Sequence, residues 1–76
     1  MVHIKITPYL RETFNITKET FEVELKGQVT VHDFLKQIGI KKPEYVLVVI
    51  NGKALPKTTP IKDGDCIEVL PVFEGG

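Results

Sequence analysis

The sequence is poor in several features that define large classes of proteins. Its 76 residues include one cysteine and no tryptophan. A single cysteine excludes an internal disulfide and a cysteine-rich metal cluster, as is typical of a reducing compartment. Ten basic and ten acidic residues give a formal net charge of zero, so bulk charge provides no basic field for nucleic acid or anionic lipid. We therefore expect a protein partner, with no nucleic acid and no bound metal.

Long apolar runs are also absent from the sequence. The first residues, Met1 to Ile6, alternate apolar and polar side chains and lack the long apolar stretch of a secretory signal. No run approaches the roughly 20 apolar residues that a membrane-spanning helix needs. We therefore expect a cytoplasmic protein without membrane association, folded as one small domain around a single core.

Two alternating segments are the first structural signals that the sequence contains. In segments 2–6 and 21–25, apolar residues alternate with polar or charged ones, which is the period of a β-strand with one buried face. We predict that they pair as a hairpin, although the connection between them is longer than a tight turn needs. Within this connection, residues 10–14 predict a short helical turn that buries Leu10 and Phe14.

A well-defined helix is predicted after Thr30. This residue can cap the first turn, with Asp33 as the acidic partner of a capping box. Gly39 suits a left-handed C-cap, and Ile40 can make the apolar contact that often follows such a cap. Apolar residues at helical spacing place one face against a core: Val31, Phe34, Leu35 and Ile38.

The second half of the chain contains two further predicted strands. Residues 45–50 are strongly β-forming and apolar on both faces. A crossing loop over residues 53–62 and a tight turn over residues 63–65 lead to the last strand, residues 66–70. Pro71 is expected to end regular pairing there, because proline lacks a backbone hydrogen-bond donor.

These elements predict an α+β fold, with a mixed four-stranded sheet and one main helix packed on one face. One helix covers one face only, so the opposite face stays open to water and its apolar residues need an explanation. We expect Leu47 or Val49, together with Leu70 and Phe73, to lie on this open face or beside it. We interpret them as a partner-binding surface.

The chain finishes on Gly75 and Gly76, directly after the last predicted strand. Glycine lacks a Cβ, so two of them at a chain end indicate a backbone that another protein must approach closely. We predict a domain over residues 1–71 and a flexible tail over residues 72–76. The Gly76 carboxylate can then be threaded into the active site of a partner.

Several motifs at matching spacing together resemble one group of proteins. They are the Thr30-Val31 helix start, the strand ending Val49-Ile50-Asn51-Gly52, the Asp63-Gly64-Asp65 turn and the Gly75-Gly76 end. With the order of the elements, they are similar to the β-grasp sulfur carriers of the MoaD and ThiS families. The resemblance covers essentially the whole chain and extends to ubiquitin, which belongs to the same superfamily. It implies a ubiquitin-like β-grasp fold.

The resemblance also implies that this chain supplies the reacting atom while partner enzymes do the chemistry. An adenylating enzyme of the MoeB or ThiF type would join the Gly76 carboxylate to AMP. A sulfur donor, such as a cysteine desulfurase or a rhodanese, would then turn the adenylate into a thiocarboxylate, and Gly75 would keep the tail slender. ATP and Mg²⁺ are expected on the activating partner and no cofactor on this chain, because nothing in it resembles a phosphate-binding glycine loop.

The receiving pathway is indicated by two short stretches. Leu10-Arg11-Glu12 and Pro71-Val72 are similar to MoaD, so the resemblance favours molybdopterin synthesis with a MoaE-like large subunit of the synthase. Phe73-Glu74 departs from the smaller residues often found before the diglycine. The alternatives are a ThiS-like carrier that serves a ThiG-like thiazole synthase, a tungsten-cofactor or tRNA-thiolation role, and a ubiquitin-like modifier conjugated through Gly76.

Other reactive side chains are interpreted as inert or solvent-exposed. Cys66 has no base in its local sequence, so we expect an inert thiol instead of a persulfide or thioester carrier. His3 and His32 stand isolated and predict surface roles rather than metal ligation. Four lysines predict solvated side chains: Lys41, Lys42, Lys53 and Lys57. No acidic pair forms a convincing acid and base, so we do not expect an enzyme.

Overall fold

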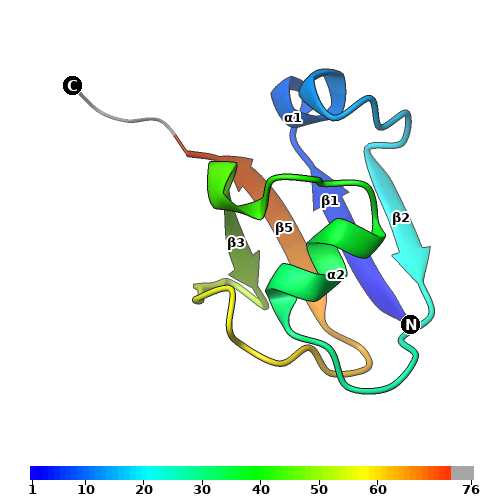
Figure 1. Ribbon diagram of the computed structural model, residues 1–76. Helices are drawn as coiled ribbons and strands as arrows, with labels where there is room; N and C mark the ends of the chain where they lie inside the picture. The colour runs from blue at the N-terminus through cyan, green and yellow to red at the C-terminus, as the bar shows by residue number, and fades with distance from the viewer. Residues whose placement is uncertain (73–76) are drawn as a thin grey trace.

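One mixed β-sheet with a helix across it makes up the part of the chain that the computed structural model describes, residues 1–72 (Figure 1). In chain order the elements are β1 (Val2–Ile6), α1 (Pro8–Thr13), β2 (Thr20–Val23), α2 (Val31–Gln37), the 3₁₀ helix η1 (Pro43–Tyr45), β3 (Val46–Ile50), β4 (Lys53–Ala54) and β5 (Cys66–Pro71). The sheet has the order β2-β1-β5-β3-β4. Helix α2 lies across one face of it (Figure 1), which confirms the predicted α+β class.

Strand β5 lies at the centre of the sheet although it comes last in the chain. It pairs parallel with β1, where Ile4 is opposite Ile67, and antiparallel with β3, where Val48 is opposite Val69. The predicted hairpin of β1 and β2 is confirmed, with the two strands antiparallel. The pairing with β1 ends at Val69 and the pairing with β3 continues to Pro71, so the point where the chain leaves the sheet is set by β3 and the residue before it, Tyr45.

The core lies between α2 and the sheet. Buried and exposed residues alternate along β1, and Phe34 and Leu35 of α2 are 1% and 0% exposed. The predicted caps of α2 are confirmed: Thr30 Oγ1 accepts a hydrogen bond of 3.3 Å from the Asp33 amide. At the other end Gly39 has a φ of 106°, which is suited to glycine, and the buried Ile40 donates from its amide to the Leu35 carbonyl at 2.9 Å.

The predicted number of strands, four, is wrong, because the expected crossing loop begins with a further strand. Lys53 and Ala54 pair with Ile50 and Val49 across a tight turn. Both turn residues, Asn51-Gly52, have positive φ, 51° and 85°, and this geometry matches the twist of a two-residue hairpin. The strand that follows the turn is only two residues long and carries no apolar alternation, so no periodic pattern in the sequence indicates it.

The prediction that Pro71 ends the pairing is also wrong. Pro71 belongs to β5, where it is opposite Val46, and the amide of the next residue, Val72, donates to the Tyr45 carbonyl at 3.2 Å. In an antiparallel ladder only alternate residues exchange hydrogen bonds with a given neighbour, so a proline at a non-donating position leaves the ladder intact.

Two smaller differences concern helical segments. Tyr45, predicted as the first residue of a strand, is the last residue of η1. The predicted helical turn at residues 10–14 is α1, which begins at Pro8, a residue favoured in the first turn of a helix. Leu10 is buried at 2% exposure, whereas Phe14 is only partly buried against the core.

Candidate functional site

The face of the sheet opposite α2 carries an apolar patch at one end. Leu47 of β3 is opposite Leu70 of β5, and Val49 follows Leu47 on the same face. Leu47 is 50% exposed, while Val49 and Leu70 are partly buried. We call Leu47, Val49 and Leu70 the apolar patch. These residues alternate with buried ones, so they are not needed to fill the core.

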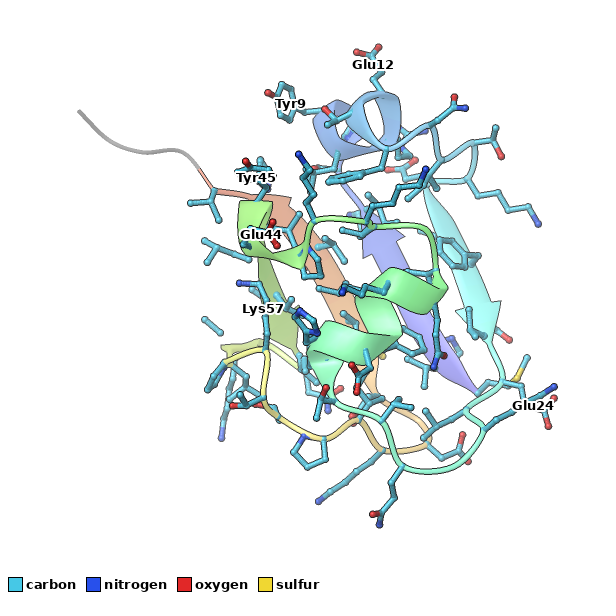
Figure 2. The ribbon with its side chains drawn as sticks, viewed as in Figure 1. Tyr9, Glu12, Glu24, Glu44, Tyr45 and Lys57 are labelled. Carbon is cyan, nitrogen blue, oxygen red and sulfur yellow. The ribbon has the colours of Figure 1, made fainter. Side chains whose placement is uncertain are left out.

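The apolar patch lies beside the point where the chain leaves the sheet. Val72, the last described residue, is 40% exposed and is hydrogen-bonded to Tyr45, which is 57% exposed. Figure 2 shows Tyr45 of η1 and Tyr9 of α1 at this end of the molecule. The remaining predicted site residues, Phe73, Gly75 and Gly76, lie outside the described residues. The structure therefore places three of the predicted partner-binding residues together, next to the start of the predicted tail.

The other part of the open face is polar and hollowed. A depression of about 530 Å³ is lined by residues from four strands and by the Asn51-Gly52 turn. His3, Lys5 and Glu68 contribute polar groups to it, and Val49, shared with the apolar patch, contributes apolar surface. The open face thus combines an exposed apolar patch at the chain exit with a polar hollow farther along the same strands.

His3 and Cys66, which looked isolated in the sequence, are neighbours in the sheet. His3 is paired with Cys66 on β5 and with Glu22 on β2, so all three side chains share the open face. His3 Nδ1 lies 3.2 Å from Glu22 Oε1, and His3 and Glu22 are half exposed. The prediction that His3 is surface-exposed is confirmed, but the expectation that it stands isolated is wrong. No local signal reveals this row, because its members come from three separate segments.

A network of polar side chains fixes the start of β5. Asp65 Oδ2 accepts from the Lys62 amide at 2.8 Å, and Asp65 Oδ1 accepts from Asn51 Nδ2 at 3.0 Å. Asn51 Oδ1 in turn accepts from the Cys66 amide at 3.0 Å. The Asn51-Gly52 turn and the Asp63-Gly64-Asp65 turn are therefore hydrogen-bonded to each other, and these bonds set the position of β5 beside β3.

Asp63, in the same region, forms an exposed ion pair with the amino group of Met1. A hydrogen bond from this ammonium group and its positive charge lower the pKa of the Asp63 carboxyl below its ordinary value of 3.8. The pair joins the start of β1 to the turn before β5. It is a contact between ends of adjacent strands and brings no further reactive group together.

The charged residues elsewhere do not gather into a reactive centre. None of the ion pairs found within residues 1–72 involves a lysine, and Lys42 Nζ lies 5.6 Å from the centroid of the Tyr45 ring. Over the same residues, no three histidine, cysteine or acidic side chains are grouped closely enough to hold a metal ion. No helix there has the length and apolar character of a membrane span.

Comparison with known proteins finds a family and several similar structures. The model of the ThiS family matches residues 6–76. A putative molybdopterin converting factor, subunit 1, from Pyrococcus furiosus is 24% identical over 92% of this chain and 94% of its own, with a TM-score of 0.71. A ThiS thiamine biosynthesis protein from Geobacter metallireducens is 24% identical, over 97% and 99% of the two chains, with a TM-score of 0.60.

A third similar structure is a chain of the BexX/CysO complex from Amycolatopsis orientalis. It is 25% identical, with full coverage of both chains (100% and 100%) and a TM-score of 0.65. The similar structures share the ubiquitin-like β-grasp fold, and the family model covers nearly the whole sequence. The chain therefore belongs to the ThiS family and is a sulfur carrier of the ThiS/MoaD type.

Proposed function

We propose that the chain carries sulfur as a thiocarboxylate on Gly76 and delivers it in the synthesis of molybdopterin. The observation that most directly supports a carrier that works through Gly76 is the extent of the family match, which runs to residue 76 and so includes the diglycine. The central position of β5 adds to it. A tail that continues from this strand starts from a position fixed by pairing with β3, so a partner that binds the domain finds the start of the tail at a fixed place.

The chemistry follows from the poor reactivity of a free carboxylate. In the proposed first step a Gly76 carboxylate oxygen attacks the α-phosphorus of ATP on an activating enzyme, and pyrophosphate leaves. The resulting mixed anhydride has a good leaving group. The outer sulfur of a persulfide on a donor protein then attacks the carbonyl carbon and displaces AMP. A thiol cleaves the S–S bond of the resulting acyl disulfide, which leaves the thiocarboxylate on the chain end and a disulfide on the donor. Replacing Gly75 or Gly76 by a residue with a side chain would widen the tail and crowd the carbonyl carbon that is attacked.

The apolar patch is the surface we propose for docking on the activating enzyme and on the synthase large subunit. Exposed apolar residues that cluster, rather than occur singly, usually mark an interface. Leu47 is half exposed and its register partner Leu70 is beside it, close to Val72. Phe73 would extend the patch along the tail. The likeness to a chain of the BexX/CysO complex also supports binding to another protein.

In this proposal the chain is a co-substrate and the partners are the catalysts. The described residues offer one polar row and no metal-binding group, while activation requires nucleotide and magnesium binding. We therefore place ATP and Mg²⁺ on an adenylating enzyme of the MoeB or ThiF type. A cysteine desulfurase or a rhodanese would supply the sulfur.

The choice of pathway depends on the receiving synthase. Leu10-Arg11-Glu12 and Pro71-Val72 favour a MoaE-like large subunit. The second candidate is thiazole synthesis with a ThiG-like subunit, which the match to the ThiS family model favours. Sulfur transfer from the thiocarboxylated chain to the precursor of one pathway, with purified subunits of both, distinguishes the two.

The central experiment measures the state of the chain end. Incubation with the activating enzyme, ATP and a sulfur donor should add the mass difference between sulfur and oxygen to the intact protein. Gly76→Ala should abolish both this gain and adenylate formation, measured by exchange of pyrophosphate into ATP. His32→Gln, on α2, serves as a control and should behave as wild type. A normal thiocarboxylate yield in Gly76→Ala would contradict the proposal. Adducts of the whole chain on lysines of other proteins, without a thiocarboxylate, would instead identify a modifier.

A further inference from the structure

The open face of the sheet brings a thiol, an imidazole and a carboxylate into one row. Cys66 of β5 is in register with His3 of β1, and His3 is in register with Glu22 of β2. Neighbouring strands lie about 4.8 Å apart, and paired residues project on the same face. The thiol therefore has an imidazole as its immediate cross-strand neighbour, which its local sequence does not supply.

Glu22 is placed to orient this imidazole. His3 Nδ1 lies 3.2 Å from Glu22 Oε1. A carboxylate oxygen at this distance favours a proton on Nδ1, so Nε2 keeps its lone pair and can accept a proton. Cys66 is a free and exposed cysteine. A nucleophile, a proton acceptor and a group that positions the acceptor are thus side by side, the combination that activates thiols and hydroxyls in proteins.

The hollow beside the row has room for a small reactant. Its volume of about 530 Å³ is lined by all three residues of the row, and sites for small molecules are commonly about 300–1,000 Å³. Val49 adds apolar surface, Lys5 adds a positive charge, and Glu68 adds a second carboxylate in addition to that of Glu22. Groups of both charges next to an apolar side chain suit a small zwitterionic molecule that carries sulfur, an ammonium group and a carboxylate.

We propose that Cys66 is an exchange site for small zwitterionic disulfides of the glutathione type, with His3 as proton acceptor and Glu22 as the residue that positions His3. The thiol proton passes to His3 Nε2 while Cys66 Sγ attacks one sulfur of the disulfide. A new S–S bond forms between Cys66 and this sulfur, and the original S–S bond breaks. The leaving sulfur takes the proton from His3. Cys66 is oxidised and the released half is reduced, so no other oxidant is needed.

The test is the rate at which the folded protein forms a mixed disulfide with oxidised glutathione at neutral pH, followed by intact mass. The matched control is Lys53→Cys in a Cys66→Ser background, since residue 53 is exposed on a strand and is paired with Ile50 instead of a histidine. Wild type should react about tenfold faster than this control, because an unassisted thiol is already a few per cent thiolate near pH 7 and leaves room for a gain of roughly one order of magnitude.

Four further variants assign the roles within the row. His3→Gln should lower the rate to that of the control, whereas His32→Gln should leave it unchanged, although His32 also lies beside a carboxylate, 3.6 Å from Asp33. Glu22→Gln should slow the reaction, and Glu22→Asp should retain more of the rate, as a positioning role requires. Unfolding in guanidinium chloride should remove all these differences, because the row exists only in the sheet.

Two results would overturn the proposal. One is equal rates for folded wild type and folded His3→Gln, with both shown to be folded by circular dichroism. The other is a wild-type rate no higher than that of the Lys53→Cys control. Either would make Cys66 an ordinary exposed thiol, and neither depends on the chemistry at Gly76.

Discussion

The two faces of the sheet are built from the same strands but differ in what their residues do. On the face covered by α2, residues of the central strands are almost completely buried, with Ile67 at 2% and Val69 at 0% exposure. On the open face, the next residue along β5 is partly buried Leu70, and its neighbour Leu47 is 50% exposed. Alternation along a strand therefore lets one face hold the fold while the other is free to bind partners.

Truncation on the covered face should have the largest effect on stability. Phe34 is 1% exposed at the centre of α2, so Phe34→Ala removes a buried ring and leaves a cavity. We expect a loss of about 3–5 kcal/mol in the free energy of unfolding, measured by guanidinium denaturation. Phe34→Leu fills most of the space, so it should lose less stability and can still be measured if Phe34→Ala does not fold. A loss below about 1 kcal/mol for Phe34→Ala would mean that α2 does not close the core as described.

Substitution on the open face should leave stability nearly unchanged and weaken partner binding. For Leu47→Asp we expect a change within about 0.5–1 kcal/mol in the free energy of unfolding, because the side chain is half exposed. If the apolar patch docks on the activating enzyme, its binding should weaken about tenfold or more, measured by calorimetry. The matched control is His32→Asp, an exposed position on α2. If Leu47→Asp and this control bind the activating enzyme equally well, the apolar patch is not its docking surface.

The smallest predicted effect lies at the margin of the sheet, at the ion pair of Asp63 with the Met1 amino group. The pKa of Asp63 is lowered in the folded state, so its stabilisation is fully present above the ordinary value of 3.8 and is lost as the pH falls below it. Thermal unfolding of wild type and Asp63→Asn should therefore differ slightly at neutral pH and converge at the acid end of the titration. Acetylation of the Met1 amino group should reproduce the variant. A difference that persists at low pH would show that the charge of Asp63 is not its cause.

Local patterns in the sequence predicted most of the elements correctly. The alternation of β1 and the capping signals of α2 each involve only a few neighbouring residues, so both elements can be recognised in the sequence. The pairing of β4 was missed because this strand is only two residues long. The continuation of β5 through Pro71 was missed because it depends on β3, which another part of the chain supplies. The apolar patch could be predicted because a single helix covers only one face of the sheet. Leu47, Val49 and Leu70 are apolar although they lie on the other face.

The sequence alone determined the family and the covered face of the sheet, because each follows from short motifs or periodic residues. Only the tertiary structure decided which side chains meet across strands. The row of Cys66, His3 and Glu22 is the clearest case, since register joins residues that are far apart in the chain. The hydrophobic pattern decides which face a side chain takes, but its period of two residues allows more than one register, so only the folded sheet fixes which residues are opposite one another.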